Sequence, residues 1–199
     1  SNNTAVGANA LNDNTTGTEN TAVGSLALDA NTTTNANTAI GFEALSANTS
    51  SGNTGVGHKV LKSNTSGSGL VALGTQALFT NTTGNYNVAI GYDALQQNNA
   101  SYNTAIGHDA LKANTTGTEN TAVGSIALDA NTTGTYNTAM GHSALSALTT
   151  GSNNVAVGRV SMSSGTTAYN NVAVGTRSLD ALQTGGYNTA IGDGALGAY

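Results

Sequence analysis

Residues 3–7 read Asn-Thr-Ala-Val-Gly, and this pentapeptide decides the fold because close variants of it recur throughout the chain. Twelve copies follow one another at intervals of 16 or 17 residues, and glycine closes each of them. Four residues after each closing glycine stands a leucine or, once, a methionine, followed by Asn-Thr-Thr-Gly or a variant. Self-similarity at a fixed period is typical of repeat architectures. The copies begin at residues 3, 20, 37, 53, 70, 87, 103, 120, 137, 154, 171 and 188.

The short period excludes helical repeats, because two helices and a loop need more than about 30 residues. Thr, Val and Ile in alternation favour a strand, and frequent Gly and Asn favour turns. Two strands of four or five residues with two turns fill one coil of a solenoid. The sequence therefore predicts an all-β fold, a parallel β-solenoid or β-roll of twelve coils of 16–17 residues. We expect residues 1–199 to form a single solenoid domain, a fragment of a longer fibre.

A longer repeat lies over the short one. Residues 14–33 and 114–133 are identical except that Leu26 is replaced by Ile126. Their offset of 100 residues spans six of the short repeats. A past duplication of a six-repeat block is the simplest explanation.

Side chains alternate between the two faces of a strand, so the five positions of the pentapeptide divide into two sets. Position four is always Val, Ile, Leu or Met, and together with the leucine column it is predicted to form the core. Position three is Ala in every copy but one, which has Gly55. We expect this small face to be covered by a second copy of the chain, the alternative being that Ala only suits a tight bend. The predicted interface residues are Ala22, Ala39, Ala72, Ala89, Ala105, Ala122, Ala139, Ala156 and Ala173.

Two columns of asparagine accompany the repeat. The asparagine at position one is expected to form an amide ladder along the stack. The second column, which includes Asn14 and Asn131, is expected to cap a turn through its own backbone. Several of these sites match the N-glycosylation pattern, which carries little weight in so Asn- and Thr-rich a chain.

Composition excludes several classes of function. The net charge is −5 and the five Lys and Arg are scattered, so no basic surface suits nucleic acid. No apolar run approaches the roughly 18 residues of a membrane span, so no membrane insertion is expected of this segment. There is no cysteine, and the carboxylates show no pairing suited to acid–base catalysis. His58, His108 and His142 share one repeat position too far apart for a metal site, unless three chains form a histidine ring. We predict neither enzyme activity nor a cofactor or metal.

Two surface columns are candidates for ligand binding. Tyrosine directly precedes the signature asparagine in four copies and could stack on sugar rings, the alternative being that it covers the turn. These residues are Tyr86, Tyr102, Tyr136 and Tyr187. Paired threonines such as Thr15 and Thr16 resemble ice-binding proteins in composition only.

The signature resembles the head repeat of YadA-type trimeric autotransporter adhesins, Asn-Ser-Val-Ala-Ile-Gly, most closely in residues 87–91 and 154–158. It is also similar to repeats of phage tail fibres and of surface proteins that carry an endosialidase-type chaperone domain. The resemblance implies a left-handed β-roll, a homotrimer around one axis, and an extracellular place on a virion or cell surface. It implies a structural or adhesive fibre segment that gives reach and contacts a host-surface glycan or receptor. The alternative is a glycan- or ice-binding surface on the same solenoid.

Overall fold

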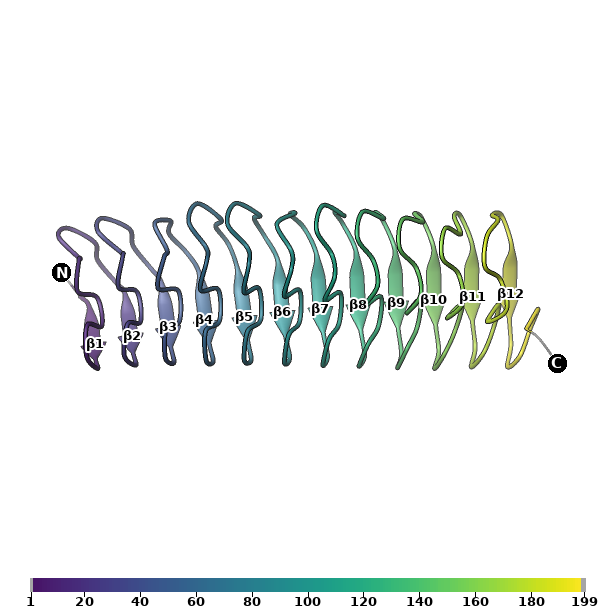
Figure 1. The fold of residues 1–199 in the computed structure, drawn as a ribbon, viewed down its shortest axis with the longest axis horizontal. Coiled ribbons are helices and arrows are strands. Elements are labelled where there is room, and N and C mark those ends of the chain that lie inside the picture. The colour runs from purple at the N-terminus through teal and green to yellow at the C-terminus, as the bar shows by residue number, and fades with distance from the viewer. Residues whose placement is uncertain (1, 198–199) are drawn as a thin grey trace.

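The computed structural model describes residues 2–197, which wind into a single elongated solenoid with one strand in each repeat (Figure 1). All the strands lie side by side in one parallel sheet, in chain order. They are β1 (Thr4–Val6), β2 (Thr21–Val23), β3 (Thr38–Ile40), β4 (Thr54–Val56), β5 (Val71–Leu73), β6 (Val88–Ile90), β7 (Thr104–Ile106), β8 (Thr121–Val123), β9 (Thr138–Met140), β10 (Val155–Val157), β11 (Val172–Val174) and β12 (Thr189–Ile191).

Each position of the repeat stacks on its equivalent in the next coil. Thr104 pairs with Thr121, Ala105 with Ala122 and Ile106 with Val123, and the same register holds along the whole sheet. Residues 2–197 contain no helix. The predicted all-β parallel solenoid is therefore confirmed.

In the coils that residues 2–197 form, the predicted second strand is absent. The six residues after each signature glycine, which we call the leucine turn (125–130 in the eighth repeat), form consecutive turns in the first eleven repeats. Ile126 and Leu128 have φ of 50° and 54°, in the left-handed region, and an extended strand needs negative φ. The backbone is still satisfied between coils, because the Leu128 amide donates to the Ala144 carbonyl oxygen at 3.0 Å.

The inward and outward faces of the strand are the reverse of those predicted. Ala122 is fully buried inside the chain's own coil, whereas Thr121 and Val123 lie on the outer side. The interior beside the strand has little spare room: a Cβ added at Gly55 would lie 3.1 Å from Cγ1 of the buried Val60, which stands where most other coils have alanine. The prediction that the alanine column lines an interface between chains is therefore wrong. The alanines concerned are Ala22, Ala39, Ala72, Ala89, Ala105, Ala122, Ala139, Ala156 and Ala173, all buried against the leucine column.

The predicted asparagine ladder is present, and it lies inside the solenoid. Oδ1 of Asn120 accepts hydrogen bonds from the backbone amide and Nδ2 of Asn137, at 3.0 and 3.1 Å. Nδ2 of Asn120 donates to the Gly134 carbonyl oxygen at 2.8 Å, across the interior of the same coil. The side chain thus links two adjacent coils and two sides of its own coil.

The second asparagine column is buried beside the first. Nδ2 of Asn131 donates to Oδ1 of Asn114 at 2.8 Å and to the Gly134 carbonyl oxygen, three residues on, at 3.1 Å. The expected contact with its own turn is therefore confirmed, together with a second ladder. These amides are enclosed in the folded chain, so the glycosylation pattern at Asn114 and Asn131 marks structural positions.

We predict that Asn120→Ala destabilises the solenoid by about 2–4 kcal/mol. It leaves the buried Asn137 backbone amide without a partner, which costs about 1–3 kcal/mol, and it removes one of the two hydrogen bonds to the Gly134 carbonyl oxygen, worth about 1 kcal/mol more. Chemical denaturation followed by circular dichroism measures the loss. A change below about 0.5 kcal/mol, the usual range for surface substitutions, would show that the ladder is not needed for stability.

We predict that Gly124→Ala destabilises more than Gly192→Ala. Both glycines have positive φ, 137° and 125°, so both substitutions introduce backbone strain of about 1–3 kcal/mol. At Gly124 the new Cβ would also lie 2.5 Å from the Gly141 carbonyl oxygen, whereas at Gly192 the nearest atom is 3.9 Å away. Equal losses of melting temperature would contradict this close stacking of the glycine column.

We predict that Val160→Asn stabilises the chain by about 1 kcal/mol. Val160 has φ of 59°, a conformation that strains a β-branched residue and that asparagine adopts readily. Asn9 occupies the same repeat position with φ of 56°, so the reciprocal Asn9→Val should destabilise by a similar amount. Thermal denaturation of both variants tests the pair, and a loss of stability in Val160→Asn would contradict it.

Candidate interaction surfaces

The three histidines do not form a common site. His58 stacks on Phe42 with ring centroids 5.6 Å apart, and His108 stacks on Tyr92 at 5.5 Å. His142 hydrogen-bonds the neighbouring Ser143 hydroxyl at 2.9 Å. Within residues 2–197 no three His, Asp or Glu side chains gather as a metal site would require. The candidate sites are therefore surfaces along the rod.

The first surface is the sheet face. It is formed by the outward side chains at positions two and four of each pentapeptide, which are the first and third residues of each strand. Position four is apolar in all twelve repeats, and Leu73 and Met140 still expose 47% and 44% of their surface. None of the strand residues is charged. Large exposed apolar patches on a soluble protein mark interaction sites. Sequence reasoning missed this surface because it assigned these side chains to the core.

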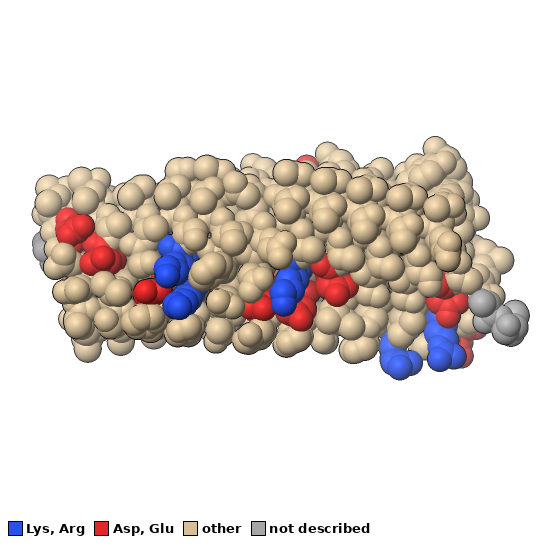
Figure 2. Space-filling view, in the orientation of Figure 1, with Lys and Arg blue, Asp and Glu red and all other residues tan. Residues whose placement is uncertain are grey.

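The charged residues occupy a different side of the rod. Only Glu19 and Glu119 lie just before a signature asparagine, and every other charged residue of the chain lies in a leucine turn. Figure 2 shows these side chains as a band of red and blue along one face. This charged strip is suited to remain in water, whereas the sheet face is suited to be covered.

Ion pairs in the charged strip connect neighbouring coils. Nζ of Lys112 lies 3.0 Å from carboxylate oxygens of both Asp93 and Asp109, and hydrogen bonds to these two groups raise the pKa of Lys112. Lys62 pairs with Glu43 at 2.6 Å and lowers the pKa of that carboxyl, while burial raises the pKa of Asp129. Partly exposed pairs of this kind contribute at most about 1 kcal/mol each. They reinforce the stack of coils.

The second surface is the tyrosine column, formed by Tyr86, Tyr102, Tyr136 and Tyr187. The structure brings Tyr86 and Tyr102 together as a stacked pair with centroids 5.4 Å apart and planes at 21°. Tyr136 lies two repeats beyond Tyr102, and Tyr187 packs edge-on against Tyr169 instead. All four ligand candidates expose more than half of their surface. Sequence analysis missed Tyr169 because it precedes its signature asparagine by two residues.

The threonine turn, the five or six residues that complete a coil (131–136 in the eighth repeat), uses its first threonine to hold the stack. The Thr115 hydroxyl donates to the Thr132 carbonyl oxygen at 3.0 Å, and the Thr132 hydroxyl donates to the Thr149 carbonyl oxygen at 3.1 Å. These hydroxyls are therefore already engaged in bonds between coils.

The geometry defines a β-solenoid repeat protein whose surface divides into an apolar face, a charged strip and an aromatic column. No family model, curated protein or solved structure gives a significant match to the chain. No helix able to cross a bilayer occurs in the part of the chain that the structure describes.

Proposed function

We propose that this chain is a structural, non-enzymatic segment of an extracellular fibre, in which copies of the chain associate through the sheet face. One observation carries the proposal: an uncharged surface with an apolar column runs through all twelve repeats, on a different side from the charged strip. Burying apolar surface between chains would contribute about 25 cal/mol per Å² to the free energy of association. Because the same face recurs in every repeat, this contribution would add up along the rod.

A second copy of the chain is the partner that best fits this face. Rows of side chains follow one another at the strand spacing of about 4.8 Å, and a copy of the chain has the same period. Closed symmetry around an axis covers the face in every subunit and leaves no apolar surface free. The resemblance to adhesin heads supports three chains and a left-handed coil. In this arrangement the rod gives reach, and its outer columns meet a receptor or glycan on the host.

Ice binding is a second candidate function, and the outward residues of the sheet support it better than the threonine turn, whose hydroxyls are already bonded between coils. Position two is Thr in eight repeats and Val in four, and these residues face outward on a sheet of uniform register. Regular rows of hydroxyl and methyl groups would suit ordered water if no partner chain covered them. Measurement of thermal hysteresis separates this function from self-association, which hides the same face.

We predict that Val123→Glu prevents assembly without unfolding the chain. Val123 points outward, so the monomer tolerates the carboxylate, whereas burying an unpaired charge between chains costs several kcal/mol. The adjacent Ala122→Glu should instead unfold the chain, because that side chain is enclosed. Sedimentation velocity measures assembly, and circular dichroism measures folding.

Ser125→Glu in the charged strip is the matched control, and it should leave both assembly and folding unchanged. A wild-type chain that stays monomeric at micromolar concentration would contradict the proposal. So would a Val123→Glu variant that assembles as the wild type does.

A further inference from the structure

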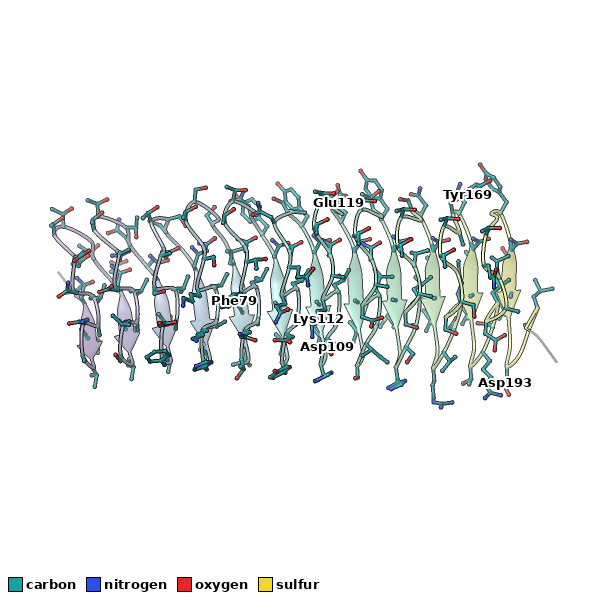
Figure 3. The ribbon with its side chains drawn as sticks, in the orientation of Figure 1. Phe79, Asp109, Lys112, Glu119, Tyr169 and Asp193 are labelled. Atoms are coloured by element: carbon teal, nitrogen blue, oxygen red, sulfur yellow. The ribbon has the colours of Figure 1, made fainter. Side chains whose placement is uncertain are left out.

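The tyrosine column is interrupted at one point by a carboxylate. Tyr102, Glu119 and Tyr136 occupy the same position in three consecutive repeats, and φ is positive at all three, between 58° and 64°. With the same backbone conformation, their side chains project from the same edge of the rod. Figure 3 shows Glu119 at that edge, away from Lys112 and Asp109.

The stacked pair next to the interruption indicates how the rings lie. Tyr86 and Tyr102 belong to adjacent coils and stack nearly parallel, so the rings of this column follow one another along the rod. Tyr86 stacks on Tyr102 from one neighbouring coil, and the neighbouring coil on the other side carries Glu119 at the same repeat position. Tyr136 follows one coil beyond. The short chain of Glu119 thus leaves a gap between two aromatic rings.

The width of this gap favours one kind of ligand. Two coil steps at the strand spacing separate the rings by about 10 Å. A group midway would lie about 5 Å from both ring centroids, within the roughly 6 Å over which a cation is attracted to an aromatic face. A flat aromatic ligand stacked between two rings needs contacts of about 3.5–4.0 Å on each side, so it would be too thin. A tetrahedral group fits better.

The charge at this edge favours a cation. Glu119 is exposed, and all five Lys and Arg of the chain lie in leucine turns on the charged strip. Figure 2 shows an isolated red patch at the upper edge of the rod, apart from the blue side chains. A positively charged ligand would therefore meet a carboxylate and two aromatic faces with no competing cation of the chain beside them.

We propose that Tyr102, Glu119 and Tyr136 form a binding site for a quaternary or methylated ammonium group, of the kind carried by choline. The two rings hold the methylated cation between their faces, and the Glu119 carboxylate lies opposite its charge. The site lies outside the sheet face and goes beyond the role of the chain as a fibre segment.

The internal duplication provides a matched control. Glu19 lies in residues 14–33, which repeat residues 114–133 with one difference, but its neighbours in the column are Asn2 and Ala36. Its local sequence is therefore the same, and only the aromatic rings are missing. Binding that depends on the carboxylate alone would occur equally at both glutamates.

The experiment titrates the full chain with choline chloride and follows the backbone amide signals of residues 117–120 and 17–20 by nuclear magnetic resonance, with sodium chloride as the ionic control. We expect a dissociation constant of the order of 1–10 mM, with shifts confined to residues 117–120 and their neighbours. Tyr102→Leu, Tyr136→Leu and Glu119→Gln should each weaken binding about fivefold or more, whereas Glu19→Gln and Tyr187→Leu should leave it unchanged. Circular dichroism verifies that each variant is folded.

Two further ligands make the result specific. The neutral isostere 3,3-dimethylbutan-1-ol has the shape of choline without its charge and should bind at least about tenfold more weakly. Equal binding of the isostere, stronger binding of a methyl glycoside, or equal shifts around Glu19 would overturn the proposal, as would no binding at about 50 mM choline. The same samples are analysed by sedimentation, so a failure of self-association is distinguished from a failure of this site.

Discussion

The structure depends on the hydrogen bonds of asparagine side chains enclosed within the coil. A repeat of 16–17 residues encloses little space, and one leucine column, alanines and asparagine amides fill it. An asparagine such as Asn120 has both a donor and an acceptor, and it meets the backbone of its own coil and of the next. Buried polar groups are tolerated when all of them are bonded, and a fully bonded network specifies one arrangement.

Each of the two asparagine ladders is interrupted where leucine replaces an asparagine. Leu148 replaces the second-column asparagine one coil after Asn131, and Oδ1 of Asn131 is buried without a hydrogen-bond partner. Leu70 makes a similar substitution in the first column and is fully buried. Leucine thus fits the space but ends the continuity of the amides, so occasional interruptions are accommodated in a stack of otherwise bonded coils.

The narrow interior determines the character of the exterior. Because alanine, or glycine in β4, occupies the inner side of the strands, the large apolar residue at position four faces outward. Ile106 and Val123 therefore belong to the surface, although their residue type is usual in cores. The buried asparagines and the exposed apolar residues at position four follow from the same narrow interior. The charged leucine turns keep another side of the rod in contact with water.

The period, the location of the strands and their parallel order could be predicted from the sequence, because a stacked repeat permits few alternatives. The facing of the strands could not, since the usual rule that large apolar residues point inward fails when the coil is too narrow for them. The regularity of the alanine column was the signal that its space is restricted. The left-handed conformation of residues such as Leu128 has no sequence signature, which is why a second strand was expected. The tyrosines were found from their shared position, but the relation of Glu119 to Tyr102 and Tyr136 required the stacking geometry.

The direction of the hydrogen bonds has a mechanical consequence. The backbone bonds between coils run along the rod, so a force that pulls the two ends of one chain apart loads each coil boundary in turn. A coil of about 17 residues that rises about 4.8 Å in the stack can extend to nearly 60 Å once released, about twelvefold. A single solenoid under tension would therefore lengthen in discrete steps and absorb work at each one. Chains joined side by side would share the load across several boundaries at once and yield at a higher force.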